Sequence, residues 1–505
     1  MSKIFYKPFY FLIFAIYPIL ALFANNIDQV DAIVIFRPVI ISLLTSIILW
    51  IAFRLIFGNW HSASLFTAFL LVLFFLYGHM YDYIKNKDLF GFILGRHRIL
   101  MLIWGGLIVG GFFFAFSRKR SIQNYAPTLN IIALSLLIFP VLTALSYWIS
   151  IRSIPSIEFQ SVTKLNTQEN QSLPDVYYII LDSYTRSDVF RNVYGYDNSD
   201  FLNELNELGF YVAECSTSNY MWTRLSMSSS LNMEYLQELP SYLSATDKDV
   251  ITEELIHHSF VRQNFESLGY KTVAFATGFP FNEITDVDLF LEPPATFKST
   301  RGFEALLVKT TLLRVLQDFG YIKINQTASA EYRDRTLLAL REFENFKEMG
   351  GPKFVYMHII TPHPPFVFGA NGETVYPKDF LSTEGQYTDE SYSTGYIDQV
   401  EFISIEIIDS IRTLLNESDS LPIIILQGDH GPWKQDGENR FSILNAYYMP
   451  GHEDELYQSI SPVNSFRVVF NEYFNGNYPL LDDISFESDY GDEYNFRLQP
   501  TSCEK

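Results

Sequence analysis

The ten residues Pro422-Ile-Ile-Ile-Leu-Gln-Gly-Asp-His-Gly431 form an apolar run that stops abruptly in two polar side chains flanked by glycines. The run is typical of a buried β-strand. Such a strand has no reason to continue into Asp429 and His430 unless these side chains act at its end. A carboxylate beside an imidazole suits a divalent metal ion that prefers nitrogen and oxygen ligands. The stretch therefore predicts a metal site at the carboxyl end of a strand.

The first 150 residues differ sharply from the rest of the 505-residue chain. They hold 11 basic and 4 acidic residues, whereas the remaining 355 residues carry a net charge of −28. Five apolar stretches lie in this part, each near the ~20 residues that a helix needs to cross a bilayer. They cover about 8–24, 33–53, 62–81, 99–116 and 129–149. We expect a five-helix transmembrane domain over 1–151, a polar linker over 152–173 and one large domain over 174–505.

The number of spans and the basic residues predict which side of the membrane the large domain occupies. Five spans place this domain on the side opposite the N-terminus, and six basic residues before or between the spans would then be cytoplasmic, as the positive-inside tendency requires. These are Lys3, Lys7, Arg54 and the cluster 118–120, whereas Lys85, Lys87, Arg96 and Arg98 depart from the rule. We expect a multi-pass protein of the cell membrane with an extracytoplasmic large domain. The acidity of this domain excludes nucleic acid as a partner.

Strands and helices alternate through the large domain. Apolar runs at 175–181, 271–276, 353–360 and 422–427 are typical of buried strands, and helical spacing covers 201–210, 260–270, 330–349 and 395–415. This alternation predicts an α/β domain with a mostly parallel central sheet. Ligands of such sheets bind beyond the carboxyl ends of the strands, so polar residues at those ends are candidate site residues.

Two further polar residues follow predicted strands. Asp182 ends the run Val176-Tyr-Tyr-Ile-Ile-Leu181, and it could be a metal ligand or a simple N-cap of the next helix. His363 lies in Ile360-Thr-Pro-His-Pro-Pro-Phe366, where three prolines fix the backbone around one imidazole. A histidine held in this way at a strand end is a candidate site residue, although isolated histidines are often structural.

A hydroxyl-rich stretch, 218–232, supplies a candidate nucleophile. A helix is predicted to start near Thr223, where free backbone N–H groups and the helix dipole favour an anion. Alone, Thr223 would be a good helix cap, and Ser226 is a rival one turn further along. A hydroxyl is a poor nucleophile at neutral pH, but a divalent cation can activate it. Together with Asp182, Asp429 and His430, Thr223 is therefore a candidate metal-activated nucleophile.

In this order, the pieces resemble the alkaline phosphatase and sulfatase superfamily, and most closely its membrane-anchored branch, which includes lipoteichoic acid synthases and lipid A phosphoethanolamine transferases. The resemblance covers the whole chain and implies an N-terminal transmembrane bundle followed by a sulfatase-like α/β domain. It implies that Asp182, Thr223, Asp429 and His430 bind the metal and that Thr223, in a Thr-x-x-Ser setting, is the nucleophile. It further implies that His363 binds the substrate phosphate.

One departure bears on the reaction. Sulfatases mature a residue within Cys/Ser-x-Pro-x-Arg, whereas Cys215 continues as Ser-Thr-Ser-Asn, which argues against sulfate ester hydrolysis. The single acidic residue Asp182 at the first strand end, where sulfatases carry a pair, points to one bound ion. Sequence does not decide whether Cys215 and Cys503, the two cysteines, form a disulfide.

The resemblance implies a metal-dependent transferase that moves a phospho-head group from a phospholipid, through a phospho-Thr intermediate, to a cell-envelope acceptor. The expected cofactor is one divalent ion (Mn, Zn, Mg or Ca), and the expected partners are the membrane and a phospholipid or lipid-linked substrate. Arg186 and Arg467 could add positive charge or be structural. Two alternatives stay open, which are a hydrolase of phosphate or sulfate esters and a catalytically silent binding protein.

Overall fold

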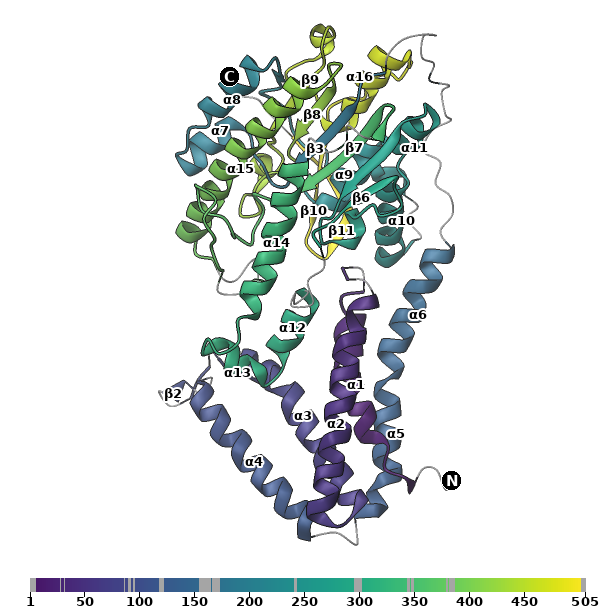
Figure 1. Cartoon of the computed structure of the whole chain (residues 1–505), viewed down its shortest axis with the longest axis vertical. Coiled ribbons are helices and arrows are strands. Elements are labelled where there is room, and N and C mark those ends of the chain that lie inside the picture. The colour runs from purple at the N-terminus through teal and green to yellow at the C-terminus, as the bar shows by residue number, and fades with distance from the viewer. Residues whose placement is uncertain are drawn as a thin grey trace. The chain divides into compact units, whose positions relative to one another are not determined.

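A computed structural model gives the arrangement of the chain (Figure 1). It describes residues 6–27, 29–30, 32–85, 87–89, 92–93, 96–117, 122–153, 165, 173–239, 243–294, 302–342, 346, 349–377, 380 and 387–500. Contacts divide the chain into two compact units, of which the first comprises Met1–Ile149 and Lys298–Ala328 and the second Ser150–Phe297 and Ser329–Lys505. The predicted linker over 152–173 lies almost wholly outside the described residues.

The first unit is a bundle of apolar helices. Among the described residues, four helical segments are long and apolar enough to cross a membrane, and they are Ala32–Phe57, Trp60–Ile84, His97–Ser117 and Ile122–Arg152. The first predicted stretch forms α1 (Tyr10–Ala24), whose 15 residues fall short of the ~20 needed to cross the hydrocarbon. The count of five spans therefore stays a prediction. Helix α1 packs against α2 (Phe36–Phe57) and α3 (Trp60–Ile84), which buries one face of it inside the bundle.

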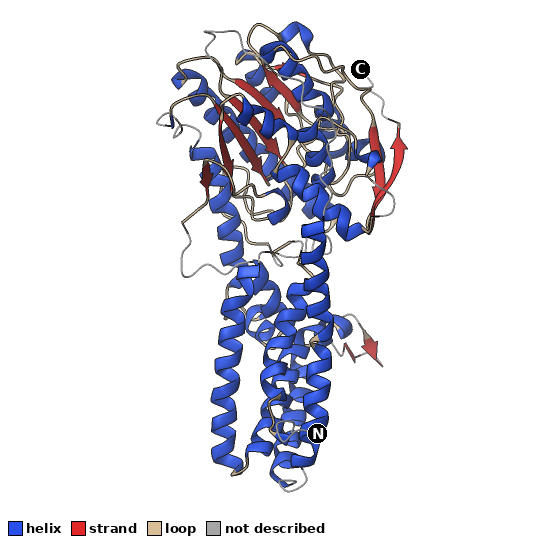
Figure 2. Cartoon of the chain, turned by 90° about the vertical axis from the view of Figure 1, so that its right-hand side faces the viewer, coloured by secondary structure: helices blue, strands red, loops and turns tan. Residues whose placement is uncertain are grey.

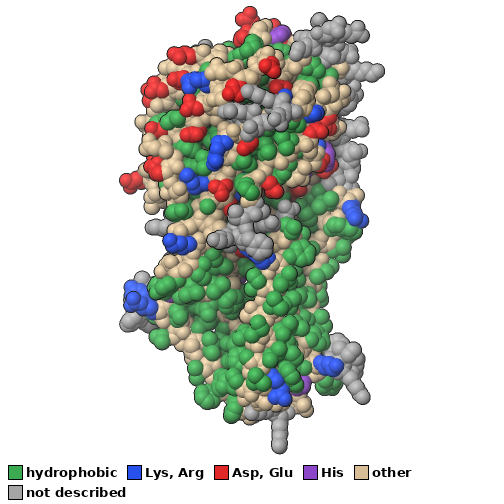
Figure 3. Space-filling model, viewed as in Figure 1, with side chains coloured by type: hydrophobic (Ala, Val, Ile, Leu, Met, Phe, Trp, Pro, Cys, Tyr) green, Lys and Arg blue, Asp and Glu red, His purple; other side chains and the backbone are tan. Residues whose placement is uncertain are grey.

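Apolar side chains cover much of the surface of this first unit, whereas acidic side chains gather on the second (Figure 3). Exposed residues of the first unit include Ile48, Leu55, Leu102 and Phe113, which are between 64% and 80% exposed. A soluble protein rarely exposes so large an apolar surface, so these side chains are suited to lipid. The remaining helices of the bundle are α4 (His97–Ser117), α5 (Ala126–Leu136) and α6 (Ile138–Ser153).

Residues 302–328, which the sequence assigned to the large domain, group with the first unit by their contacts. They contain α12 (Gly302–Thr310) and α13 (Leu313–Asp318). Arg314 Nη1 donates to Asp82 Oδ2 at 2.6 Å, and the Leu312 N–H donates to the Phe74 carbonyl at 2.8 Å. These contacts tie the segment to α3. The limits predicted for the large domain stay a prediction.

The second unit is built on a seven-stranded sheet of order β4-β9-β8-β3-β7-β5-β6. The five strands from β8 to β6 are parallel, while β9 is antiparallel to both β8 and β4. The bounds are β3 (Val176–Leu181), β4 (Tyr211–Val212), β5 (Lys271–Phe275), β6 (Leu289–Leu291), β7 (Lys353–Ile359), β8 (Ile423–Gln427) and β9 (Asn445–Tyr448). The mostly parallel sheet predicted from sequence is therefore present.

Helices cover both faces of the sheet (Figure 2). Alternate residues of β3 enter two different cores, with Tyr177 and Ile179 in one and Tyr178 and Ile180 in the other. The first core is closed by α8 (Ser199–Glu207), α14 (Ile324–Arg341) and α15 (Asp389–Glu417), and the second by α9 (Thr223–Asn232), α11 (Phe260–Ser267) and α16 (Pro462–Phe474). Burial on both faces explains why the strands are continuous apolar runs.

Short elements complete the unit. They are α7 (Ser187–Val189), α10 (Ala245–His257) and the hairpin of β10 (Ser485–Asp489) and β11 (Asp492–Gln499). A two-stranded pairing of β1 (Asp88–Leu89) with β2 (Phe92–Ile93) lies in the first unit. The predicted helix over 330–349 instead begins at Ile324 and ends at Arg341.

Candidate metal and nucleophile site

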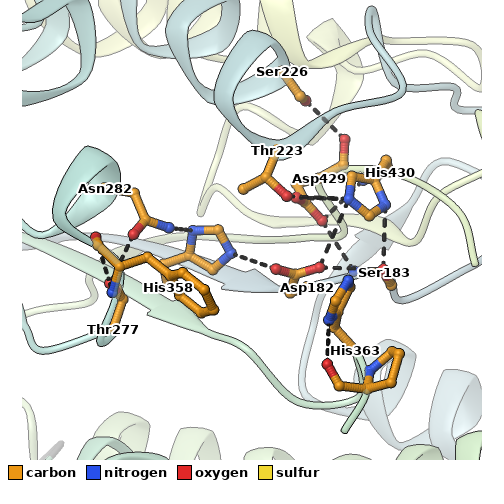
Figure 4. Close-up of polar contacts among 12 residues, drawn as sticks. Asp182, Ser183, Thr223, Ser226, Thr277, Asn282, His358, His363, Asp429 and His430 are labelled. Atoms are coloured by element: carbon orange, nitrogen blue, oxygen red, sulfur yellow. Dashed lines mark hydrogen bonds and ion pairs between the residues drawn. The ribbon is translucent and has the colours of Figure 1, made fainter. Parts of the chain in front are cut away.

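The parallel register brings two strand ends together and with them two carboxylates. Asp182 follows β3, and Asp429 and His430 follow the neighbouring strand β8. The Ser183 N–H donates to Asp429 Oδ1 at 3.0 Å, which ties the two ends to each other (Figure 4). Asp182 and Asp429 are 4% and 0% exposed. Two carboxylates are therefore held in one buried site.

Close backbone contacts explain why glycines flank Asp429 and His430. A Cβ at Gly428 would lie 2.2 Å from the Tyr184 carbonyl oxygen, and one at Gly431 would lie 2.2 Å from the Asn439 carbonyl oxygen. Both contacts are with backbone, which cannot move aside cheaply. Gly428 thus lets the end of β8 approach the segment after β3, and Gly431 lets it approach the backbone at Asn439.

The hydrogen bonds of His430 determine which of its ring nitrogens carries the proton and which offers a lone pair. Its Nδ1 lies 2.9 Å from the Gly431 carbonyl oxygen, which can only accept, so Nδ1 carries the proton. The Nε2 lone pair then faces the Thr223 hydroxyl at 3.1 Å, Asp429 Oδ2 at 3.5 Å and Asp182 Oδ1 at 3.8 Å. A ligating histidine typically donates its other N–H to a carbonyl in this way.

Thr223 is the first residue of α9, and the preceding residue, Trp222, provides no capping side chain. The N-terminus of the helix therefore opens toward the site beside the Thr223 hydroxyl (Figure 4). Ser226, the rival hydroxyl, is buried and donates to the Asp429 carbonyl oxygen at 2.7 Å. The next hydroxyl, that of Ser228, donates to the Arg224 carbonyl four residues back at 2.7 Å. Of the three, Thr223 is the hydroxyl that faces the carboxylates and His430.

His363 enters the same site from the loop after β7. Its backbone N–H donates to the Asp182 carbonyl at 3.1 Å, and its Nδ1 lies 2.6 Å from the Pro364 carbonyl oxygen. The other ring nitrogen points toward Asp182 and Ser183 (Figure 4). The Tyr332 hydroxyl donates to the His363 carbonyl at 3.1 Å, which steadies the loop from α14.

One site residue was missed from the sequence. His358 lies inside β7, and its Nε2 is 3.4 Å from Asp182 Oδ2. Ligand atoms of Asp182, His358 and Asp429 all lie within 4.8 Å of one another, which makes this the candidate metal cluster among the described residues. The signal in the sequence was a single imidazole in an otherwise apolar strand, five residues before His363.

Asn282 and Thr277 hold the far side of the His358 ring (Figure 4). The Asn282 amide lies 3.0 Å from His358 Nδ1, and the Thr277 hydroxyl lies 2.7 Å from the other end of that amide. The amide nitrogen donates to Nδ1, so the ring proton lies on Nε2, toward Asp182. A metal bound at Nε2 would replace this proton and would require the amide to rotate, so that its oxygen accepts from Nδ1. The pair Asn282 and Thr277 can therefore fix the tautomer of His358.

The electrostatics of the site favour a cation. Burial, followed by repulsion from the Asp182 carboxylate, raises the pKa of Asp429 to about 6. Burial acts to raise the pKa of Asp182 as well, but the neighbouring imidazoles, His363 first, outweigh it and hold that pKa below its usual range. Burial and the Arg440 guanidinium lower the pKa of His430 well below its ordinary value, which keeps this ring neutral. Asp429 Oδ2 and His358 Nε2 are buried without a hydrogen-bond partner among the described residues. Such unpaired buried atoms fit metal ligands.

Three other residues that were named from the sequence, Arg186, Arg467 and Cys215, have partners within the fold. Arg186 is buried and forms a double contact with the Asp188 carboxylate at 2.7 Å. Arg467 is 1% exposed and donates to the Met233 carbonyl at 3.0 Å. Neither guanidinium is free to bind a substrate. Cys215 is not a free thiol, and Cys503 lies outside the described residues.

Comparison with known proteins gives structural neighbours only. No family model matches the chain, and no curated protein matches it by sequence. The integral membrane lipooligosaccharide phosphoethanolamine transferase A from Neisseria meningitidis is 12% identical, with 94% of this chain and 95% of that chain covered and a TM-score of 0.42. The C-terminal periplasmic domain of EcEptC from Escherichia coli, in complex with Zn, is 11% identical, with 63% and 87% covered and a TM-score of 0.41.

A third neighbour, the phosphonate monoester hydrolase of Agrobacterium radiobacter, is 12% identical, with 62% and 80% covered and a TM-score of 0.39. These neighbours include a transferase and a hydrolase. The resemblance to the membrane-anchored branch of the alkaline phosphatase and sulfatase superfamily rests on the motifs of this chain. At these identities and TM-scores, the activity of this chain has to follow from its own residues.

Proposed function

We propose that this protein is a membrane-bound, metal-dependent phosphotransferase with Thr223 as its nucleophile. The observation that supports it most is the position of the Thr223 hydroxyl, at the start of α9 and 3.1 Å from His430 Nε2 beside two buried carboxylates. A silent binding domain would have no need of a hydroxyl, two carboxylates and three imidazoles in one buried cluster.

The residues present fit a divalent ion. Asp182 and Asp429 would hold it together with His358, whose ligand nitrogen groups with both carboxylates, and with His430, whose Nε2 faces the carboxylates and the Thr223 oxygen (Figure 4). When bound, such an ion polarises phosphoryl oxygens and lowers the pKa of a coordinated hydroxyl. Because imidazole nitrogen is among the donors, Zn suits the site better than Ca, Mg or Mn, which favour oxygen ligands.

In the reaction we propose, the Thr223 oxygen bonds to the phosphorus of a phospholipid head group. The bond from phosphorus to the diacylglycerol oxygen breaks, and that oxygen takes up, in net terms, the proton that the Thr223 hydroxyl gives up. The free N–H groups at the start of α9 stabilise the phosphoryl oxygens. His363 is placed to bind the phosphate or to give the leaving oxygen its proton. An acceptor hydroxyl then takes the group from Thr223, which regains its own proton.

The apolar first unit supports a lipid-linked donor, because it would keep the catalytic unit at a bilayer surface. The acceptor would be a glycan or lipid of the cell envelope, with the second unit on the extracytoplasmic side. A hydrolase would differ only in using water as the acceptor, and both reactions begin with the same attack by Thr223.

Release of diacylglycerol tests the proposal. The full chain, loaded with Zn or Mn, is mixed with vesicles of phosphatidylethanolamine and phosphatidylglycerol. We expect diacylglycerol to accumulate with the wild type and to be absent with Thr223→Ala at equal metal content. Equal release by both proteins would refute the role of Thr223, and no release by the wild type from either lipid would refute the donor class.

A further inference from the structure

The helices α12 and α13, which come from the large domain's part of the sequence, dock onto the ends of three membrane helices. Three side-chain contacts join them to these helices, and they are Glu304 with Arg37, Arg314 with Asp82 and Asp318 with His97. Arg37 lies in the first turn of α2, Asp82 in the last turn of α3 and His97 at the start of α4. Because consecutive membrane spans run in opposite directions, these three helix ends share one side of the membrane. The two docked helices therefore lie at that membrane surface.

The contact with α3 extends well below the end of that helix. A Cβ at Gly78 would lie 2.2 Å from the Lys309 carbonyl oxygen, so the two backbones touch there. The Leu312 N–H donates to the carbonyl of Phe74, which lies about 15 Å along the helix from its last residue, Ile84. The whole of α3 is about 38 Å long, close to the thickness of a bilayer with its head groups. The turn between α12 and α13 thus reaches the depth where head groups meet acyl chains.

The exposed side chains of this docked segment are apolar and aromatic. Leu316 and Phe319 are exposed, and Tyr321, just after α13, is 80% exposed. The acidic residue between them, Asp318, is paired with His97 at 2.9 Å. Aromatic rings are enriched where membrane helices meet the head groups. Side chains of this kind at this depth are suited to the membrane interface rather than to water.

Basic side chains lie beside this aromatic surface, at the point where the sequence departs from the positive-inside tendency. Four exposed residues between α3 and α4 carry the charge, and they are Lys85, Lys87, Arg96 and Arg98. Lys85 pairs with Asp82 at 2.9 Å, and the Lys87 ammonium lies 3.5 Å from the centre of the Tyr83 ring. The guanidinium groups of Arg96 and Arg98 form no ion pair with a residue that the structure describes. Lys and Arg side chains gather on this flank of the first unit in Figure 3, where Figure 1 labels β2.

From these observations, we propose that the chain has an interfacial anchor that binds anionic phospholipid head groups of the bilayer holding it. The anchor comprises six residues, which are Lys87, Arg96, Arg98, Leu316, Phe319 and Tyr321. The apolar and aromatic side chains enter the head-group region, while the basic ones pair with lipid phosphates. Two features of this surface support a lipid as its occupant, namely its unbalanced positive charge and its continuity with the membrane helices. The anchor does not depend on the reaction of Thr223.

Lipid retention tests the charged part of the anchor. The full chain is purified with equal amounts of phosphatidylglycerol and phosphatidylcholine, and native mass spectrometry counts the lipids that stay bound. We expect a preference for phosphatidylglycerol, which Arg96→Gln/Arg98→Gln should lower roughly fivefold for each charge removed. The matched control, Arg191→Gln/Arg341→Gln, removes two exposed charges from the second unit and should keep the preference. An unchanged preference in Arg96→Gln/Arg98→Gln, or an equal loss in the control, would overturn the proposal. A lipid held at Thr223 would stay bound in both variants.

The depth of Tyr321 tests the apolar part. A nitroxide on Tyr321→Cys reports its surroundings in vesicles that contain phosphatidylglycerol, and Cys215 does not compete for the label because it is disulfide-bonded. We expect this label to collide with dissolved oxygen more often than with a water-soluble nickel chelate. A label on Tyr376→Cys, an exposed position of the second unit, should show the reverse. A Tyr321→Cys label that is as open to nickel as the control would overturn the proposal. Shielding from both reagents would also overturn it, because the occupant would then be the acidic second unit and not lipid.

Discussion

Two hydroxyls on one helix, those of Thr223 and Ser226, should respond to alanine substitution in opposite ways. Thr223 faces His430 Nε2 at 3.1 Å, so its removal takes away the attacking oxygen but no support of the fold. We expect Thr223→Ala to lose several powers of ten in turnover, as missing nucleophiles do, with folding and metal content intact. Thr223→Ser should keep part of the activity, because the oxygen remains.

Ser226→Ala removes a buried donor 2.7 Å from the Asp429 carbonyl. A buried acceptor left without its partner costs about 1–3 kcal/mol, so the domain should melt earlier. Even if all of this cost reached the transition state, turnover would fall by no more than roughly 100-fold. Thermal melting followed by circular dichroism and diacylglycerol release measure the two effects. The reasoning is refuted if Thr223→Ala keeps more than about a hundredth of wild-type turnover. It is also refuted if Ser226→Ala is as inactive as Thr223→Ala at an unchanged melting temperature.

Three further predictions concern the metal and the membrane. A chelator should abolish turnover, and added metal should restore it. Asp429→Ala should lower the bound metal, measured by elemental analysis, close to zero. Stoichiometric metal in this variant would contradict the proposed ligands. Because the pKa of Asp429 in the metal-free site is raised to about 6, protons compete with the metal below that pH. Metal affinity, measured by competition, should then fall roughly tenfold per pH unit below 6. Because the folded state holds this proton more tightly than the unfolded chain does, the metal-free domain should lose stability as pH rises through about 6. The control is Asp398→Asn, which removes another carboxyl group whose pKa is raised and should leave this pH dependence unchanged. A metal affinity that stays constant from pH 7 to 5 would exclude the mechanism. A protease added to spheroplasts should cut within 152–173, and protection of this stretch until lysis would reverse the predicted topology.

Much of the candidate site could be proposed from the sequence, because several of its residues follow continuous apolar runs. Asp182 and Asp429 each follow a strand that is buried on both faces, and such strands read as unbroken hydrophobic stretches. His358 could not be found in this way, because it lies within its strand. Its role depends on the register that sets Ile180 opposite His358 in the sheet, and no local pattern specifies that pairing.

Other features depended on contacts between distant parts of the chain. The choice between Thr223 and Ser226 rests on the bond from Ser226 to the Asp429 carbonyl, across 203 positions of sequence. The grouping of 298–328 with the membrane helices rests on pairs such as Arg314 with Asp82. The edge strand β4 and its antiparallel neighbour β9 have two and four residues, too few for a clear periodic signal.

The central claim is that Thr223 carries the phospho-head group between donor and acceptor. The most direct measurement is mass spectrometry of the metal-loaded full chain after incubation with phosphatidylethanolamine or phosphatidylglycerol, without acceptor. We expect the peptide that contains Thr223 to gain the mass of the phospho-head group, with fragmentation placing it on Thr223, and to lose it when acceptor is added. An adduct on Ser226, or diacylglycerol release with no adduct on the trapped protein at any time, would contradict the account.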